Sequence, residues 1–109
     1  MEYRIIVGQR ARNDAEGIVS FIAGHSHAAA CNWYEELMVH MVGLSRMPRR
    51  HAVAFDPELN DLGIRQMVFG NYRVLFAVDD HSKTVQVLHI RHGARRSASV
   101  DDVLFDDGV

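Results

Sequence analysis

The spacing of apolar residues changes twice along the chain, and these changes restrict the fold more than any other feature. Tyr3 to Val7, YRIIV, is a short β-branched run of the kind found in strands. Between residues 11 and 44 the apolar residues instead recur every three or four positions, which is the period of a helix. The stripe is broken at Gly24-His25-Ser26, so it predicts two helices joined by a short turn.

The residues at the ends of the two stripes mark the limits of these helices. Gly24 ends the first helix, and the hydroxyl of Ser26 is suited to cap the second. Pro48 closes the second helix because proline cannot continue the hydrogen-bond ladder. The short connection predicts an antiparallel helical hairpin, which needs a sheet to cover.

Three further strand-like runs follow, at residues 64–69, 72–79 and 84–91. Gly70-Asn71 predicts a tight turn between the first two runs, and Asp56-Pro57 predicts a single helical turn before them. We therefore predict an α+β fold, with an N-terminal strand and an antiparallel two-helix hairpin packed on one face of a twisted antiparallel β-sheet. Residues 1–97 are predicted to form one domain, followed by an acidic C-terminal tail at residues 98–109.

Alternation along the strands assigns side chains to the two faces of this sheet. The face under the helices is predicted to hold Val68, Val74, Phe76, Val78, Leu88 and Ile90. The opposite face is predicted to hold Arg65, Arg73, His89 and Arg91, with Met67, Phe69, Leu75, Ala77, Val85 and Val87. This second face is expected to be open and partly apolar, like a groove with a basic rim. Either this face or the helical hairpin is expected to bind a partner segment with acidic and hydrophobic side chains.

Charge is divided unevenly along the 109 residues. The formal net charge is −2, but four aspartates lie in the last nine residues, at positions 101, 102, 106 and 107. Subtracting these four from the 14 acidic residues leaves 10 against 12 basic ones, a net charge of +2 before residue 101. All basic residues except Lys83 are arginines, whose planar fork matches phosphate or carboxylate. The bias favours anion contacts, with ordinary solvated surface charge as the alternative.

Other features of the composition exclude several classes of protein. Cys31 is the only cysteine, so no internal disulfide is expected. The apolar runs fall short of the roughly 18 to 20 residues that a membrane span requires, and we expect neither a signal peptide nor a membrane anchor. His25-x-His27 and His89-x-x-His92 have no cysteine partner, so neither a metal site nor a cofactor is predicted.

Arg73 and His92 are candidates for chemistry. Arg73 is predicted in the middle of a strand, where a guanidinium needs a partner or an open face. It either pairs with an acidic residue such as Asp79 or Glu58, or binds an external anion, and both interpretations stay open. The imidazole of His92 is a candidate general base in RNA cleavage, with Arg73 and Arg95 stabilising the phosphate. An ordinary packed or solvated histidine is the alternative.

Two blocks of sequence, IRQMVFGNYRVLF and VLHIRHGAR, stand close together near the end of the chain. With YRIIV and a helical hairpin that carries Trp33, they strongly resemble the RelE/ParE toxins of bacterial type II toxin–antitoxin modules, also labelled plasmid stabilisation proteins. The resemblance extends from Tyr3 to about Ser97. It implies a small cytoplasmic toxin that forms a hetero-oligomer with a cognate antitoxin, whose C-terminal segment wraps the toxin.

The resemblance implies two types of target. RelE-like toxins cut mRNA in the ribosomal A site without a metal, whereas ParE-like toxins poison DNA gyrase and are not known as nucleases. Arg73 and Arg95 match arginines that bind the scissile phosphate in RelE-like members, and Arg65 lies near the position of a catalytic lysine. We therefore predict ribosome-dependent mRNA cleavage, with Arg65, Arg73, Arg95 and His92 as the catalytic residues. The stretch SASVDDVLF lacks the tyrosine usual in RelE-like nucleases, so a gyrase inhibitor, or a toxin that only binds its antitoxin, is the alternative.

Overall fold

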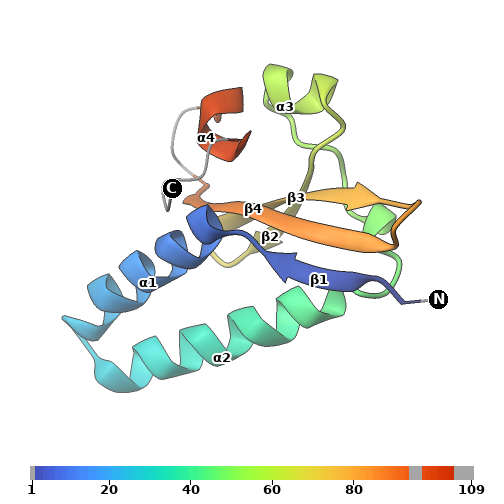
Figure 1. Cartoon of the computed structure of the whole chain (residues 1–109). Coiled ribbons are helices and arrows are strands. Elements are labelled where there is room, and N and C mark those ends of the chain that lie inside the picture. Colours follow the sequence, from blue (N-terminus) through green and yellow to red (C-terminus); the bar gives the residue numbers. More distant parts are fainter. Residues whose placement is uncertain (1, 94–96, 105–109) are drawn as a thin grey trace.

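A mixed four-stranded sheet lies at the centre of the computed structural model, which describes residues 2–93 and 97–104. Its strand order is β1-β4-β3-β2, with β1 at Arg4–Val7, β2 at Arg65–Phe69, β3 at Tyr72–Asp79 and β4 at Thr84–His92. The long helices α1 (Gln9–Ala23) and α2 (His27–Gly43) form a hairpin on one face of the sheet. The short helices α3 (Pro57–Asp61) and α4 (Val100–Leu104) lie on the other face (Figure 1).

The predicted α+β class and the helical hairpin on one face are confirmed. Strand β3 runs antiparallel to both β2 and β4, as predicted. Strand β1 differs, because it runs parallel to β4, with Arg4 opposite Thr84 and Val7 opposite Val87. The sheet is therefore mixed and not wholly antiparallel. No tight turn connects β1 to β4, so the sequence does not force these two strands to run in opposite directions.

The predicted turns, the end of α1 and the start of α2 are also confirmed. The predicted end of α2 at Pro48 is wrong, because α2 ends at Gly43 and Pro48 begins a separate 3-10 turn. The N–H of Ala29 donates to Oγ of Ser26 at 3.1 Å, so Ser26 caps α2. Helix α1 ends at Gly24, and α3 begins directly after Asp56. Gly70 has a φ of +57°, a left-handed conformation that favours glycine, in the turn between β2 and β3. These features depend on residues close in the sequence, which explains why the sequence predicts them.

The main core lies between the helical hairpin and the sheet. Its buried residues are Ala11, Ala15, Leu37, Met41, Leu44, Met67, Phe69, Val74, Phe76, Val85, Val87 and Ile90. The positions predicted for Val74, Phe76 and Ile90 are confirmed. Those of Met67, Phe69, Val85 and Val87 are wrong, because these side chains were predicted on the opposite face.

The strand registers explain these errors. In β4, Val87 is opposite Phe76 and His89 is opposite Leu75, so Leu88 is an extra residue that reverses the alternation. Leu88 accordingly packs on the far side of the sheet and not under the helices. In β2, Val68 is opposite Arg73 and is 66% exposed, so its predicted place in the core is wrong.

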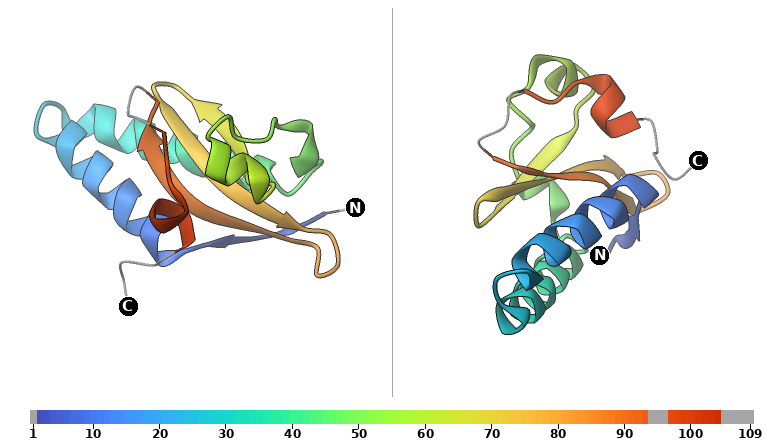
Figure 2. Two further views of the ribbon diagram at one scale, coloured as in Figure 1. Left: turned by 90° about the horizontal axis from the view of Figure 1, so that it is seen from above. Right: turned by 90° about the vertical axis from the view of Figure 1, so that its left-hand side faces the viewer.

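A second, smaller core covers the far face of the sheet. It consists of Ala54, Leu59, Ile64, Leu75, Ala98 and Val103, with Leu88 packed against it. The right-hand view of Figure 2 shows α3 and α4 on this side and the helical hairpin on the other. The predicted open groove is therefore wrong, because the chain's own segments fill it. Since Ala98 and Val103 are buried here, the packed body continues past residue 97.

Candidate functional site

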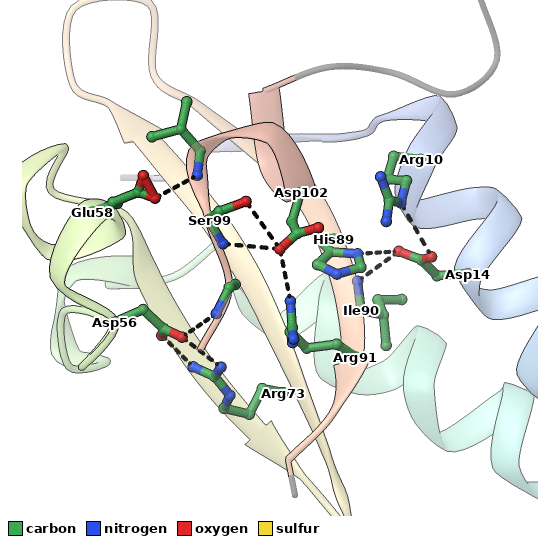
Figure 3. A network of polar contacts seen from close by, with 12 residues as sticks. Arg10, Asp14, Asp56, Glu58, Arg73, His89, Ile90, Arg91, Ser99 and Asp102 are labelled. Atoms are coloured by element: carbon green, nitrogen blue, oxygen red, sulfur yellow. Dashed lines mark hydrogen bonds and ion pairs between the residues drawn. The ribbon is translucent and has the colours of Figure 1, made fainter. Parts of the chain in front are cut away.

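Arg73 lies on the far face of the sheet, under α3 and the segment that leads to α4. Its Nη1 donates to Oδ1 of Asp56 at 2.7 Å and its Nη2 to Oδ2 at 3.0 Å, which makes a bidentate pair (Figure 3). The two side chains are 5% and 0% exposed. Nη1 also donates to Oε1 of Gln66 at 2.8 Å, and the ring of Phe55 lies 4.3 Å from the guanidinium carbon. Arg73 is thus enclosed by groups of its own chain.

Asp56 joins three separate parts of the structure. Besides Arg73, it accepts a hydrogen bond from the backbone N–H of Ala98 at 2.6 Å. Burial alone would raise the pKa of Asp56, but the hydrogen bonds from Arg73 and Ala98 and the charge of Arg73 hold the pKa below its ordinary value. The carboxylate therefore stays ionised at neutral pH and connects β3 to the entrance of α4.

The partner of Arg73 differs from the partners considered from the sequence. Asp79 instead accepts hydrogen bonds from the backbone N–H groups of His81 and Ser82 in the turn after β3. Glu58 accepts from the N–H of Val100 at 3.3 Å and helps to hold the start of α4. Asp56 was predicted only as the start of a helical turn, and its carboxylate forms no capping bond there.

A second arginine on this face, Arg91, contacts α4. Its side chain is 3% exposed, and its Nη1 lies 3.3 Å from Oδ2 of Asp102. Asp102 also accepts from the N–H and Oγ of Ser99, so its carboxylate holds the residue directly before α4. The Ser99 N–H, together with Arg91, holds the pKa of Asp102 below its ordinary value. Here an aspartate of the predicted acidic tail neutralises an arginine of the sheet.

Arg65 lies on the opposite side of the sheet from Arg73. It is opposite Phe76 in the β2–β3 register, and directly opposed residues share a face. Its Nη1 donates to the backbone carbonyls of Arg49, at 3.1 Å, and His51. The predicted common face for Arg65 and Arg73 is therefore wrong, and Arg65 instead holds the backbone of the loop after α2.

His92, at the end of β4, is exposed. Its ring makes an edge contact with Tyr72, with 5.4 Å between ring centroids. Both line a hollow between α1 and the sheet, together with Asn13, Asp14 and Arg91. Arg95 lies outside the described residues. Three of the four predicted catalytic residues therefore lie in separate environments: Arg65, Arg73 and His92.

A polar network at the edge of β4 was not predicted from the sequence. His89, predicted on an open face, is 2% exposed, and its Nδ1 contacts Oδ2 of Asp14 in α1. The same oxygen accepts the backbone N–H of Ile90 at 2.9 Å, and Arg10 pairs with the other carboxylate oxygen. Strand β1 ends opposite Val87, so Asp14 satisfies an edge N–H that no strand covers. Asp14 lies 75 residues from His89 in the sequence, and no local pattern indicates the contact.

The hairpin side offers a cavity of about 520 Å³ between β1, α1 and α2. Most of its lining residues are apolar, among them Ile6 and Met38, but polar atoms contribute nearly half of the exposed lining, and Arg12 and Glu16 add charge. Within residues 2–93 and 97–104, no three His, Cys, Asp or Glu side chains converge to hold a metal ion. None of the helices in the same ranges is long and apolar enough to cross a membrane.

Comparison with known proteins decides the family. The family model of the ParE toxin of type II toxin–antitoxin systems, parDE, matches residues 5–97. The chain belongs to this toxin family. The predicted RelE/ParE relationship is thereby confirmed, although no curated protein matches the sequence.

Solved structures agree with this assignment of the toxin. In the toxin–antitoxin complex RelBE2 from Mycobacterium tuberculosis, one chain is 28% identical, with 84% of this chain and 99% of that chain covered and a TM-score of 0.58. The chromosomal ParDE system of P. aeruginosa gives 14% identity, coverage of 84% and 96%, and a TM-score of 0.68. A double arginine mutant of E. coli RelE in the free state gives 16% identity, 86% coverage of each chain and a TM-score of 0.56. The last two similarities concern the fold alone.

Proposed function

We propose that this toxin is neutralised by a cognate antitoxin and, when released, stops growth by binding DNA gyrase, without cutting RNA. The observation that carries the proposal is the bidentate pair of Arg73 with Asp56, with side chains 5% and 0% exposed. A guanidinium held in this way is not available to a scissile phosphate. RNA cleavage also requires clustered cations, whereas Arg65 and Arg73 lie on opposite faces of the sheet.

An antitoxin partner is supported by the RelBE2 complex, whose matched chain is covered over 99% of its length. The sequence prediction allowed docking either on the arginine face or on the helical hairpin. The cavity of about 520 Å³ beside β1 favours the hairpin, because α3 and α4 cover the other face. An antitoxin segment with apolar side chains, and an acidic one near Arg12, fits this lining.

Substitution in the cavity tests the antitoxin site. Tyr34 lines the cavity and is 46% exposed, whereas Val39 on the same helix is 70% exposed and does not line it. We expect Tyr34→Ala to weaken antitoxin binding by about tenfold or more, and Val39→Ala to leave it unchanged. Titration calorimetry measures both affinities. Equal affinities for parent and Tyr34→Ala would place the antitoxin elsewhere.

A reconstituted gyrase reaction tests the target. We expect the purified toxin to reduce supercoiling by gyrase and to increase the cleaved-DNA complex, and the cognate antitoxin to reverse both effects. The His92→Ala variant serves as the matched control, because a toxin that acts by binding alone does not need a general base. Unchanged supercoiling at toxin concentrations well above that of gyrase would contradict the proposal.

The predicted mRNA cleavage is kept as the second candidate because of one observation. His92 is exposed at the end of β4 beside the ring of Tyr72, where an imidazole and a phenol are both within reach of solvent. For this candidate, expression of the toxin creates new mRNA 5′ ends at codon positions, and His92→Ala abolishes both these ends and growth arrest. Growth arrest that persists in His92→Ala with no new 5′ ends excludes it.

A further inference from the structure

The connection after α2 displays several arginines on one exposed turn. Between Leu37 and Phe55 the chain contains no Asp or Glu, but it contains Arg46, Arg49 and Arg50. All three arginines are exposed. We name residues 45–51, SRMPRRH, the basic turn. It lies beside the start of β1, because the N–H of Tyr3 donates to the carbonyl of Ser45 at 2.8 Å.

The backbone of the basic turn is held in place from several directions. Pro48 is buried and begins a 3-10 turn at Pro48–Arg50. Met47, directly before it, has a φ of +48°, so the backbone bends sharply there. The Nη1 of Arg65 donates to the carbonyls of Arg49 and His51 and closes the turn from the sheet side. A fixed backbone reduces the ordering cost of binding.

The arginines of the basic turn are only weakly engaged within the chain. Arg46 lies 3.4 Å from Glu2, with side chains 80% and 66% exposed, and Arg49 lies 2.9 Å from Asp80, with side chains 49% and 51% exposed. Ion pairs this exposed contribute little to stability, so an incoming anion readily replaces them. Among the described residues, no carboxylate forms a salt bridge with Arg50.

The surroundings of His51 indicate a local excess of positive charge. Burial lowers the pKa of His51, and the charges of Arg50 and Arg65 lower it further. The two carboxylates that pair with the turn among the described residues, Glu2 and Asp80, contact Arg46 and Arg49 and not Arg50 or Arg65.

We propose that the basic turn binds the phosphate backbone of a nucleic acid through Arg46, Arg49 and Arg50. The planar guanidinium matches phosphate oxygens in a bidentate manner, and several on one turn follow a backbone independently of base sequence. A protein partner would draw most of its binding energy from apolar anchors buried in pockets, and a rigid turn rich in exposed arginine offers few such contacts. This site is distinct from the His92 hollow, and it does not require gyrase to be the target.

Fluorescence anisotropy with labelled duplexes tests the proposal. The purified toxin is titrated into a DNA duplex and an RNA duplex of equal length, at several salt concentrations. We expect Arg46→Gln/Arg50→Gln to weaken binding on the order of tenfold. The slope of log affinity against log salt falls by about 0.9 for each phosphate that the variant no longer neutralises. The control is Arg12→Gln, which removes an exposed positive charge from α1. We expect its affinity and its salt slope to stay close to the parent values.

Each outcome has a defined meaning. Loss of binding to DNA, to RNA or to both in the double variant, but not in Arg12→Gln, supports the proposal and identifies the nucleic acid. Parent-like binding by the double variant overturns it, as does an equal loss in Arg12→Gln. Binding of the parent only to an acidic peptide such as polyglutamate also overturns it. If the double variant unfolds, Arg50→Gln, which leaves both ion pairs intact, decides through the salt slope.

Discussion

The two faces of the sheet are buried by different means. On the hairpin face, apolar side chains of the long helices pack against those of the sheet. Examples are Leu37 and Met41 in α2, and Val74 and Phe76 in β3. On the far face, short helices cover a small apolar cluster and two arginines that are paired with aspartates. The first face is held by a periodic apolar pattern, and the second by specific contacts between residues far apart in the sequence.

Because of this difference, the sequence predicts the core of the fold more readily than the role of the buried arginines. A helical stripe opposite an alternating strand identifies a core whatever the exact partners are. A buried arginine has no such general solution, because either an internal carboxylate or an external phosphate can satisfy it. In this toxin the internal aspartates Asp56 and Asp102 satisfy Arg73 and Arg91, which changes the inferred chemistry of the whole face.

The largest effect is expected where the far face loses its buried anion. Asp56→Ala leaves Arg73 charged, buried and unpaired, which should cost about 3–5 kcal/mol in the free energy of unfolding. Urea denaturation of purified protein measures the loss. The exposed Glu2→Gln variant, which breaks a surface pair with Arg46, is expected to produce no measurable change. The double variant Asp56→Ala/Arg73→Met should recover part of the loss, and a purely additive result would contradict the pairing.

On the hairpin face, truncation of one core side chain should have a slightly smaller effect. Leu37 is fully buried in α2, so Leu37→Ala should reduce the free energy of unfolding by about 3 kcal/mol, because apolar packing is removed and a cavity remains. Val39→Ala, on the exposed side of the same helix, should change it by less than about 0.5 kcal/mol. Both are measured by denaturant unfolding, and equal losses in the two variants would refute the assignment of the helix face.

Acid should reduce the contribution of the far face to the stability of the fold more than that of the hairpin face. The pKa values of Asp56 and Asp102 are lowered in the folded protein, so their contribution to stability is complete above the unfolded pKa of roughly 4. That contribution disappears as the pH falls through the lowered values. Between about pH 7 and pH 3 we therefore expect Leu37→Ala to lose stability in parallel with the parent protein. Asp56→Asn should show a weaker pH dependence, and a curve of parent slope would count against the linkage.

The smallest effect concerns the attachment of α4. Asp102→Asn weakens the pair with Arg91 and the hydrogen bonds from the N–H and Oγ of Ser99, at an expected cost of about 1 kcal/mol. Relative to the parent protein, the Asp102→Asn variant should show faster amide hydrogen exchange in residues 99–104 but not in α1. If α1 and α4 exchanged faster to the same extent, α4 would unfold only together with the whole domain.

The sequence by itself determined the features that depend on near neighbours. These features follow from local hydrogen bonding and backbone conformation: the end of α1, the start of α2 with its cap at Ser26, the turn at Gly70 and the antiparallel β2–β3–β4 order. The family follows from two motif blocks at a specific spacing, and the family model confirms it over residues 5–97.

Only the tertiary structure decided which residues meet. One extra residue in β4 reverses the side-chain alternation, and the register of β2 separates Arg65 from Arg73. The partners Asp56 and Asp102 lie 17 and 11 residues from Arg73 and Arg91, on segments whose path no local rule specifies. A guanidinium has the same chemistry in every context, so its role depends on the anion that the fold places beside it.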